Sequence, residues 1–431
     1  MSAVRELSDS ARTRAVGSLV ASRAVYAYNW YVIGPIQGTI AMGLGVSFGE
    51  VSLYLWAFLV GAGIFQIPAG IASLRWGARR TSLFGIALMS VGAVVSAFTT
   101  SPDVFFVARL GVGVGAAFFF SPGIGLIARY YTTGGRGFGI GLFNGAFSLG
   151  AATAVLLTVI LEGILGWQGA LLVAGAGMAL VSLENALALP ALSEPSLRFD
   201  VAVARAKEVL SCRYLWLLAL ALAGFWASNF AVAQYLVPWA TQWAGMKAPT
   251  AGALDALLIA TSLIGGPLGG SLAEKGRHPA RLLAASAGAT GLAVAALPFI
   301  PALSSLLLWP LAVAGGIVSG MAFGVLYYMG TLAPIARGEN VPLAVGLINS
   351  LQVFLGAFVV LGLGHELFGS QSRSGYATGW VLFGALTLIP LALLLWARVE
   401  TATPEGVSSG LGSVSAVAEV GPSAPLSPGS K

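Results

Sequence analysis

The chain has 431 residues, of which 57% are hydrophobic and only 9% are charged, with a net charge of +6. Soluble domains have about a quarter of their residues charged, so this composition argues against a soluble protein and indicates a polytopic helical membrane protein. The apolar runs are continuous, whereas barrel strands alternate in segments of about 10 residues. The single cysteine, Cys212, excludes an internal disulfide framework and a cysteine-rich metal site.

The two ends of the chain are more polar than the rest. The first eighteen residues, MSAVRELSDSARTRAVGS, mix both charges and are too long and acidic for the charged n-region of a typical signal peptide. We therefore expect a cytoplasmic N-terminal arm over residues 1–17. Thr401 to Lys431 is rich in Ser, Gly and Pro without periodicity, which predicts a disordered cytoplasmic tail over 399–431.

Twelve apolar runs between charge and turn clusters predict twelve transmembrane helices. They begin near residues 24, 51, 81, 104, 138, 166, 214, 250, 279, 305, 341 and 375. The longest polar break, Pro190 to Arg213, divides six spans from six. The expected fold is therefore an all-α membrane protein with an N-terminal six-helix bundle over 18–190, a cytoplasmic loop over 191–213 and a C-terminal six-helix bundle over 214–398.

Positive charge is distributed unevenly between the two sides, and Lys and Arg favour the cytoplasmic side. With the N-terminus inside, thirteen basic residues fall in inner loops and two, Lys247 and Arg373, in outer loops. The inner set is Arg75, Arg79, Arg80, Arg129, Arg136, Arg198, Arg205, Lys207, Arg213, Lys275, Arg277, Arg281 and Arg337. Both termini are therefore predicted to be cytoplasmic, in a multi-pass protein of the plasma membrane.

Local signals mark the start of one span and the bends of others. Ser47 and Glu50 fit the S-x-x-E capping box and predict the start of span 2. Four prolines, which remove helix hydrogen bonds, are expected to bend or break spans 1, 4, 7 and 10. They are Pro35, Pro122, Pro238 and Pro334.

The two halves of the sequence repeat one another locally. Gly70–Gly77 has a counterpart two hundred residues later in Gly270–Gly276, and Asn29 has one in Asn229. Gly141–Ala151 on span 5 recurs as Gly346–Ala357 on span 11. Internal repeats of membrane segments are typical of transporters whose halves rock around a central site.

These motifs give the chain a recognisable resemblance. Over about residues 15–400 it resembles a major facilitator superfamily transporter. The family's loop pattern G-x3-D-R-x-G-x-R-R is matched except at Leu74, where the family usually has Asp. Its fourth-span pattern R-x-x-x-G-x-G is matched by Arg109, Gly113 and Gly115. Gly145 is followed by Ala146, so the Gly-Pro signature of the antiporter subgroup is incomplete.

The resemblance implies a gate that closes the cytoplasmic ends of the two halves. The expected gate residues are Gly70, Arg75, Gly77, Arg79, Arg80, Gly270, Glu274 and Lys275. Because Leu74 replaces the family's Asp, Arg75 needs another acceptor, such as a helix C-terminus, or only anchors to lipid headgroups. We expect Glu274 to contribute more of the closure than the first-half loop.

Two ionisable residues within spans are candidates for function, since such groups are costly in a membrane. Arg109 on span 4 is expected to bind an anionic group or to couple transport to protons; the alternative is a structural bond to nearby carbonyls. Asp255 near the start of span 8 is a candidate proton carrier; the alternative is that it caps its helix.

Polar and aromatic side chains on several spans are candidates for substrate binding, because small-molecule sites combine an apolar lining with a few placed polar groups. Besides Arg109 they are Tyr28, Asn29, Asn144, Asn229, Gln234, Tyr327, Tyr328, Asn349 and Gln352. The alternatives are interfacial aromatic belts and amides that only hold helices together.

The predicted function is secondary active transport of a small solute by alternating access. An acid-poor cavity with Arg109 favours a small organic anion, with proton symport at Asp255 as a hypothesis. The alternatives are efflux of hydrophobic compounds and a non-transporting receptor or scaffold. The chain lacks a GxxxxGK[ST] loop, and we expect no enzymatic activity, metal or cofactor. The expected partners are the transported solute, a coupled proton and the lipid bilayer. We expect no binding of nucleic acid, and we expect the protein to be a monomer.

Overall fold

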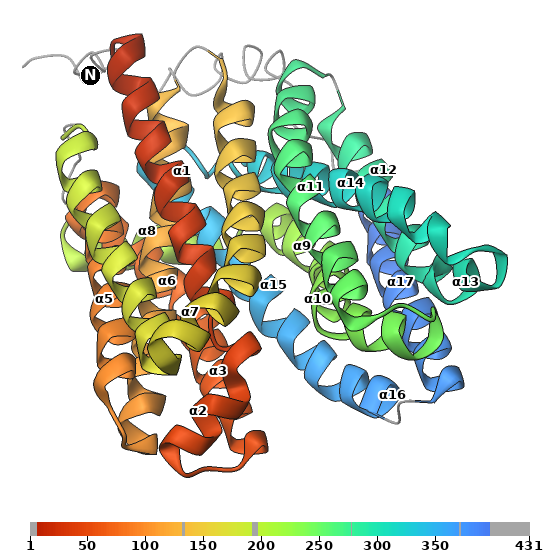
Figure 1. The fold of residues 1–431 in the computed structure, drawn as a ribbon. Coiled ribbons are helices and arrows are strands. Elements are labelled where there is room, and N and C mark those ends of the chain that lie inside the picture. Colours follow the sequence, from red (N-terminus) through yellow and green to blue (C-terminus); the bar gives the residue numbers. More distant parts are fainter. Residues whose placement is uncertain (1–6, 132–133, 192–196, 277, 370–371, 397–431) are drawn as a thin grey trace, which may run out of the picture. The chain divides into compact units, whose positions relative to one another are not determined.

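A computed structural model describes residues 7–131, 134–191, 197–276, 278–369 and 372–396. The expected tail over 399–431 lies outside them, as do residues 1–6 of the expected arm, residues 192–196 of the expected loop, and Arg277. Every regular element in the described ranges is helical (Figure 1).

The elements before residue 190 form what we call the N-half, which provides spans 1 to 6. Its helices are α1 (Asp9–Tyr31), α2 (Gln37–Leu44), α3 (Phe48–Ile64), α4 (Gln66–Trp76), α5 (Ala78–Phe98), α6 (Pro102–Tyr130) and α7 (Arg136–Ala188). A short 3-10 turn, η1 (Gly34–Ile36), separates α1 from α2. Within this half α7 packs on α1 and α5, and α6 packs on α3 and α5.

The elements after residue 212 form the C-half, which provides spans 7 to 12. Its helices are α9 (Arg213–Ala221), α10 (Ala223–Trp243), α11 (Ala248–Lys275), α12 (Pro279–Ala296), α13 (Ile300–Leu303), α14 (Leu308–Gly330), α15 (Val341–Val359), α16 (His365–Gly369) and α17 (Arg373–Trp396). Short turns η2 (Leu297–Phe299), η3 (Ser305–Leu307), η4 (Gly338–Asn340) and η5 (Val360–Gly364) connect some of them. Within this half α14 packs on α11 and α12, and α17 packs on α10 and α12.

The helices group into twelve spans. Eight helical segments of the described chain are long and apolar enough to cross a membrane, and the bent pair α3 and α4 makes a ninth. α7 supplies two spans because its 53 residues reverse direction at Gly166, where φ is +72°. With α1–α2 as span 1 and α17 as span 12, the order is that expected from the sequence.

Breaks within the spans follow local chemistry. The capping box at Ser47 and Glu50 is confirmed: the Glu50 N–H donates to Ser47 Oγ, and the Ser47 N–H donates to Glu50 Oε2 at 2.7 Å. Pro122 and Pro238 lie inside α6 and α10, and Pro35 lies in the η1 break. Pro334 does not bend span 10, because α14 already ends at Gly330.

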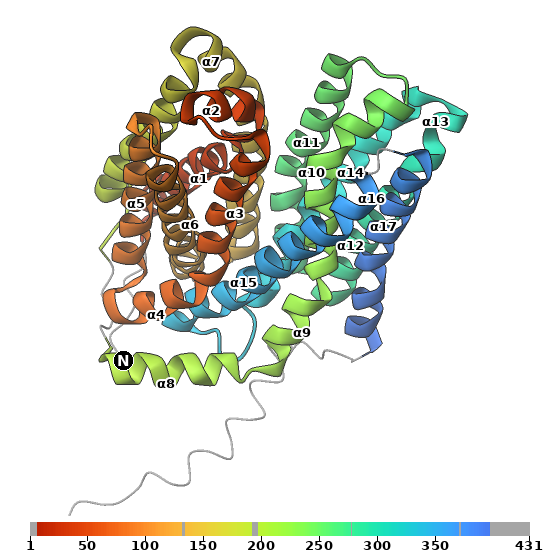
Figure 2. The same cartoon turned by 90° about the horizontal axis from the view of Figure 1, so that it is seen from below.

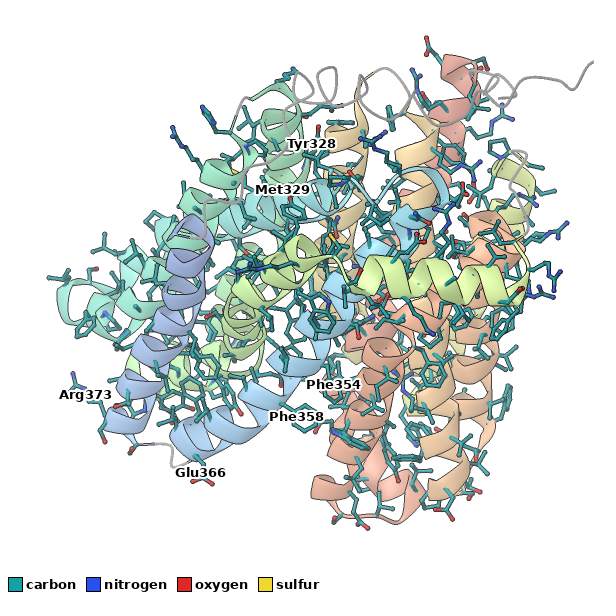
Figure 3. The ribbon with its side chains drawn as sticks, turned by 180° about the vertical axis from the view of Figure 1, so that it is seen from behind. Tyr328, Met329, Phe354, Phe358, Glu366 and Arg373 are labelled. Atoms are coloured by element: carbon teal, nitrogen blue, oxygen red, sulfur yellow. The ribbon has the colours of Figure 1, made fainter. Side chains whose placement is uncertain are left out.

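The loop between the halves contains one further helix, α8 (Phe199–Leu210). It packs on α4, α9 and α15, and Figure 3 shows it lying across the helices it contacts. The same view shows Tyr328 and Met329 at the end of the C-half nearest the loops after spans 2 and 8, with Glu366 and Arg373 at the opposite end. We refer to the first end as the predicted cytoplasmic end.

The two halves meet in two places, one along α7 and one along α15. α7 of the N-half packs on α11 and α14, and α15 of the C-half packs on α3, α4 and α6 (Figures 1 and 2). α7 with α11 and α4 with α15 are corresponding pairs in the internal repeat. The fold therefore brings the repeated segments of one half against the other half.

Candidate functional site

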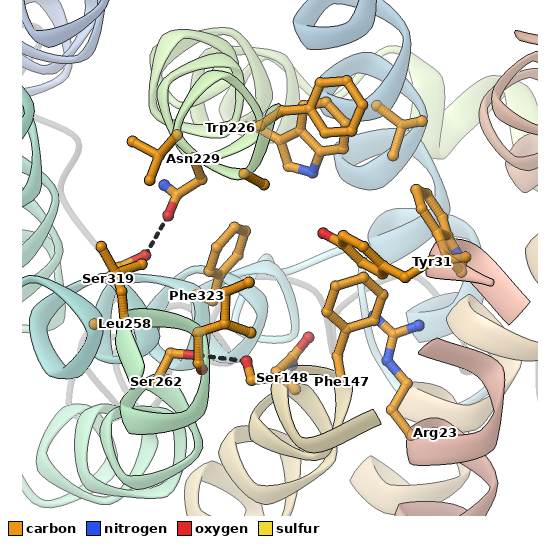
Figure 4. Close-up of a pocket in the computed structure, with 18 of the residues that line it drawn as sticks. Arg23, Tyr31, Phe147, Ser148, Trp226, Asn229, Leu258, Ser262, Ser319 and Phe323 are labelled. Atoms are coloured by element: carbon orange, nitrogen blue, oxygen red, sulfur yellow. Dashed lines mark hydrogen bonds between the residues drawn. The ribbon is translucent and has the colours of Figure 1, made fainter. Parts of the chain in front are cut away.

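A cavity of about 140 Å³ lies between the two halves. Its wall is built from α1, α7, α10, α11, α14 and α15, so both halves contribute. Most of the wall is aromatic or aliphatic, with the rings of Tyr31, Phe147, Trp226 and Phe323 among the lining groups (Figure 4). Such a concave, mainly apolar site with a few polar groups is typical of small-molecule binding.

Arg23 on α1 provides a buried positive charge in this wall. Its side chain is 7% exposed, and its Nε and Nη1 have no hydrogen-bond partner in the part of the chain that the structure describes. The guanidinium carbon lies 4.2 Å from the ring centre of Tyr26, 4.3 Å from Phe120 and 4.7 Å from Phe147. Aromatic faces stabilise a desolvated cation but leave its N–H groups available to an anion.

Amide side chains surround the same part of the cavity. The Tyr327 hydroxyl on α14 donates to Asn349 Oδ1 at 2.7 Å and to Gln352 Oε1 at 3.3 Å. Asn144 on α7 donates from Nδ2 to the carbonyl of Ile140. Tyr327, Asn349 and Asn144 line the cavity, whereas Gln352 is fully buried behind Tyr327. These bonds fix the orientation of the polar groups that face a ligand.

Polar contacts also occur on the α11 and α14 side of the cavity. Ser319 donates to Asn229 Oδ1, and Ser148 of the N-half is hydrogen-bonded to Ser262 of the C-half (Figure 4). Asp255 on α11 lies in the same wall, and its Oδ1 is buried without a partner in the described chain. Among the described lining residues, the cavity therefore contains one arginine and one carboxylate, Arg23 and Asp255, on opposite halves of the molecule.

Other sequence-predicted residues lie outside this wall. Arg109 is fully buried in the N-half, where Nη2 donates to the carbonyl of Asn29 at 3.0 Å. The Asn29 amide in turn donates to the carbonyls of Val25 and Ala174. Arg109 and Asn29 thus link α1, α6 and α7 in this conformation, as the structural alternative for Arg109 requires, while Arg109 Nε and Nη1, like those of Arg23, have no partner in the described chain.

Three further predicted residues are also absent from the cavity lining. Tyr28 is buried and its hydroxyl accepts a hydrogen bond from Thr158. Gln234 on α10 is exposed. Tyr328 lies at the predicted cytoplasmic end of α14 (Figure 3).

The predicted cytoplasmic side of the cavity is closed by a glycine seam between α7 and α11. A Cβ added at Gly137 would lie 2.1 Å from the carbonyl oxygen of Gly270, and one at Gly141 would lie 2.2 Å from that of Gly266. One turn further, Gly145 faces Leu263 in the same way. Small residues at this spacing let two helix backbones touch, so the halves are in contact from Gly137 to the Ser148–Ser262 pair.

Glu274 reinforces this seam from the C-half. Its two carboxylate oxygens accept hydrogen bonds from the backbone N–H groups of Arg136 at 3.1 Å and Gly137 at 3.0 Å. These are the first residues of α7, where unpaired N–H groups and the helix dipole favour a negative charge. Glu274 therefore caps a helix of the opposite half, while the neighbouring Lys275 is exposed.

The basic loop after span 2 is held by backbone oxygens. Arg79 donates to the carbonyls of Leu189 and Ala186, at 2.9 and 2.7 Å, at the C-terminal end of α7. Arg75 donates to the carbonyl of Leu197 at 3.4 Å. Gly77 has φ of +85° and directly precedes α5 as its N-cap residue, and Arg80 is exposed. A helix C-terminus thus serves as an acceptor in this loop, for Arg79.

The corresponding crossing of α4 and α15 is apolar. A Cβ added at Gly70 would lie 2.7 Å from the Cα of Leu343, so the missing side chain permits close approach. Leu74 is fully buried in the same apolar cluster as Leu343. Leu74 therefore makes apolar contacts at the position where the family usually has a carboxylate.

Arg23 was missed because α1 begins in the polar stretch DSARTRA, which resembles a cytoplasmic arm. The available signal was helical spacing: Arg23, Tyr26 and Trp30 fall at i, i+3 and i+7, on one face of a helix. All three line the cavity.

Comparison with known proteins identifies this architecture. The model of the Major Facilitator Superfamily matches residues 19–361. The chain belongs to the major facilitator superfamily. Its twelve helices in two six-helix bundles are the arrangement of this family, and it is a transporter rather than an enzyme.

Two curated relatives and one solved structure illustrate the range of similar proteins. The chain is 24% identical over 367 residues to the nitrite extrusion protein of Bacillus subtilis, covering 85% of this chain and 90% of that protein. It is 29% identical over 342 residues to human monocarboxylate transporter 11, covering 74% and 69%. The proton:xylose symporter XylE, at 16% identity and a TM-score of 0.69, covers 92% of this chain and 98% of its own, and shares the fold.

Proposed function

We propose that this transporter carries a small organic anion by alternating access, with Arg23 as the principal ligand of the negative group. The observation that supports this most is a buried arginine in the cavity wall whose Nε and Nη1 have no partner in the described chain. A buried cation without an ion pair is costly, and a carboxylate would supply that pair. The names of the two curated relatives, a nitrite extrusion protein and a monocarboxylate transporter, agree with an anionic cargo.

The remaining predicted substrate residues take supporting roles in this proposal. Asn144 and Asn349 line the cavity near Tyr327 and offer hydrogen bonds to polar atoms of the cargo. Asn229 lies across from them on α10. Gln352 orients Tyr327, whereas Tyr28, Asn29, Gln234, Tyr328 and Arg109 act outside the binding wall in the conformation described here.

We further propose proton symport through Asp255, in the plasma membrane with both termini in the cytoplasm. Asp255 lines the same cavity as Arg23. In this proposal a bound anion neutralises the positive charge of Arg23, and a bound proton neutralises the negative charge of Asp255. Asp255→Asn is then expected to abolish proton-driven accumulation and to preserve exchange of labelled for unlabelled anion. Loss of both activities, or of neither, contradicts this role.

We infer that the conformation described here is closed at the predicted cytoplasmic end. Of the gate residues predicted from the sequence, Gly270 and Glu274 lie at the α7–α11 crossing and Gly70 lies at the α4–α15 crossing. The seam from Gly137 to Ser148 and the cap by Glu274 lie on that side of the cavity. In this proposal the N-half and the C-half are the two rigid bodies that move during alternating access. We expect a single copy of the chain to carry out transport.

The test is transport by purified protein in proteoliposomes, with nitrate, lactate and butyrate as probes. Arg23→Gln is expected to abolish saturable anion uptake, and Arg23→Lys to retain part of it, since lysine keeps the charge but not the planar fork. Unchanged uptake by Arg23→Gln would refute the proposal.

The alternative is export of uncharged hydrophobic compounds, which the aromatic lining favours. If this is correct, a hydrophobic amphiphile such as rhodamine 6G should be transported, and Arg23→Gln should leave that transport intact.

A further inference from the structure

A second, smaller cavity of about 40 Å³ lies inside the C-half, next to the central one. It is enclosed by α10, α11, α12 and α14, together with η2. Val232, Leu258, Asn229 and Ser319 belong to the walls of both cavities. The boundary between the two is thus the hydrogen-bonded pair Asn229 and Ser319, beside Leu258 (Figure 4).

The chemistry of this side cavity is apolar. Its only polar side chains among the described residues are Asn229, Ser319 and Thr290. Asn229 donates to the carbonyl of Phe225 and accepts from Ser319, and Thr290 donates to the carbonyl of Ser286. The rest of the wall is leucine, valine, alanine and glycine. Because the polar groups are already engaged, neither water nor a polar ligand gains much there, and apolar cavities of this kind favour hydrocarbon.

Gly315 on α14 shows that the cavity has room for added atoms. A Cβ built at Gly315 meets no atom within 4 Å, although the residue lines this cavity. Its neighbour Gly316 is different, because a Cβ there would lie 2.1 Å from the carbonyl oxygen of Leu258. Gly315 is therefore not needed for helix contact, and its missing side chain leaves space beside the central cavity.

We propose that this side cavity is a hydrocarbon subsite, and that the transported anion is a monocarboxylate with an aliphatic tail. This inference rests on the proposed function: the carboxylate binds at Arg23 and the tail passes Asn229 to reach the apolar wall. A water-sized sphere needs about 10–15 Å³, so 40 Å³ holds about three carbon-sized groups. The subsite thus selects against inorganic anions, which have no tail to place there.

Chain length gives a direct measurement. Straight-chain carboxylates from acetate to decanoate are titrated into the purified full-length protein in detergent, following its tryptophan fluorescence, to which Trp30 and Trp226 in the central cavity contribute. Each methylene that enters the subsite is expected to tighten binding about fourfold. The gain should level off after about three such groups. A flat series would overturn the subsite.

Three variants locate the effect. Gly315→Leu fills the subsite and is expected to remove the chain-length gain while leaving acetate affinity within twofold. Leu311→Ala enlarges it and should move the plateau to longer chains. Gly252→Leu is the matched control: a Cβ at Gly252 also meets nothing within 4 Å, but the residue lines neither cavity. Acetate binding and a monodisperse elution profile establish that each variant is folded.

The outcomes separate this inference from the function on which it rests. If the carboxylates bind, depend on Arg23 and show no chain-length gain, the transporter proposal stands and the subsite is wrong. A gain that persists in Gly315→Leu also refutes the subsite, since the tail then lies elsewhere. If no anion of the series binds the wild type, both proposals fail.

Discussion

Glu274 should control how firmly the predicted cytoplasmic end is closed. Its carboxylate caps the first two N–H groups of α7 from the opposite half, so this interaction exists only while the halves are together. Glu274→Ala removes it without adding bulk at the seam. The variant is expected to shift molecules from the closed state towards one in which this end is open.

The size of the shift follows from the geometry. Hydrogen bonds to a charged group contribute about 1.5–3 kcal/mol when buried, and an anion at a helix N-terminus contributes about 0.3–2 kcal/mol. Glu274 is only half-buried, and water replaces both bonds when the halves separate. We therefore take about 1–2 kcal/mol in total, which lowers the ratio of closed to open molecules about 5- to 30-fold.

Distances between spin labels on the two halves measure this ratio. Leu183 on α7 and Leu272 on α11 are both exposed, at 62% and 44%, and lie near the predicted cytoplasmic ends of their spans. Each is replaced by a labelled cysteine in a Cys212→Ser background, since the chain has one native cysteine. Glu274→Ala should add a longer-distance population in double electron–electron resonance, and Glu274→Gln should give a smaller one.

Glu50→Gln provides the matched control. Glu50 also accepts a backbone N–H, from Ser47, but within the N-terminal turn of its own helix. It should leave the distance distribution unchanged. If Glu274→Ala gives the wild-type distribution, or no more change than Glu50→Gln, the cap does not stabilise closure and the reasoning is wrong.

Three further variants test other parts of the structure. Arg109→Met leaves the buried carbonyl of Asn29 without a donor but also removes a buried cation whose Nε and Nη1 have no partner in the described chain, so thermal stability should change by no more than about 1–3 kcal/mol. The variant should change anion affinity less than threefold; a selective loss of affinity in a stable variant would contradict the structural role. Gly137→Val places a side chain against the carbonyl of Gly270 and should open the seam more than Glu274→Ala does, as read by the same label distances. Arg79→Ala removes two bonds to the end of α7 and should lower the melting temperature, as measured by thermal unfolding.

Features set by local chemistry could be predicted from the sequence. Span number, the capping box at Ser47 and the chain reversal at Gly166 depend on hydropathy, a four-residue pattern and one positive φ. Pro334 shows the limit of such local rules. Proline bends a helix only when it lies inside one, and α14 ends at Gly330, before Pro334.

The candidate site depends on depth and direction, which a linear reading does not contain. Arg109 lies in the middle of the apolar run of span 4, and Arg23 lies at the polar edge of the apolar run of span 1, yet both side chains are buried. Tertiary packing decides which of the two arginines faces the cavity. Arg109 donates to the carbonyl of Asn29 inside the N-half, whereas Arg23 lines the cavity between the halves. Partners more than a hundred residues away in the chain, such as Glu274 and Arg136, were likewise not predictable by spacing.

The two corresponding crossings between the halves are held together by different forces. α11 meets α7 through glycine backbones and the charge of Glu274, whereas α4 meets α15 at Gly70, with Leu74 buried in the same apolar cluster as Leu343. Salt screens a half-exposed charge but does not weaken apolar packing. The salt-sensitive part of closure should therefore come from the α7–α11 crossing, and Glu274→Ala should remove that sensitivity while leaving the contribution of the Leu74 side in place.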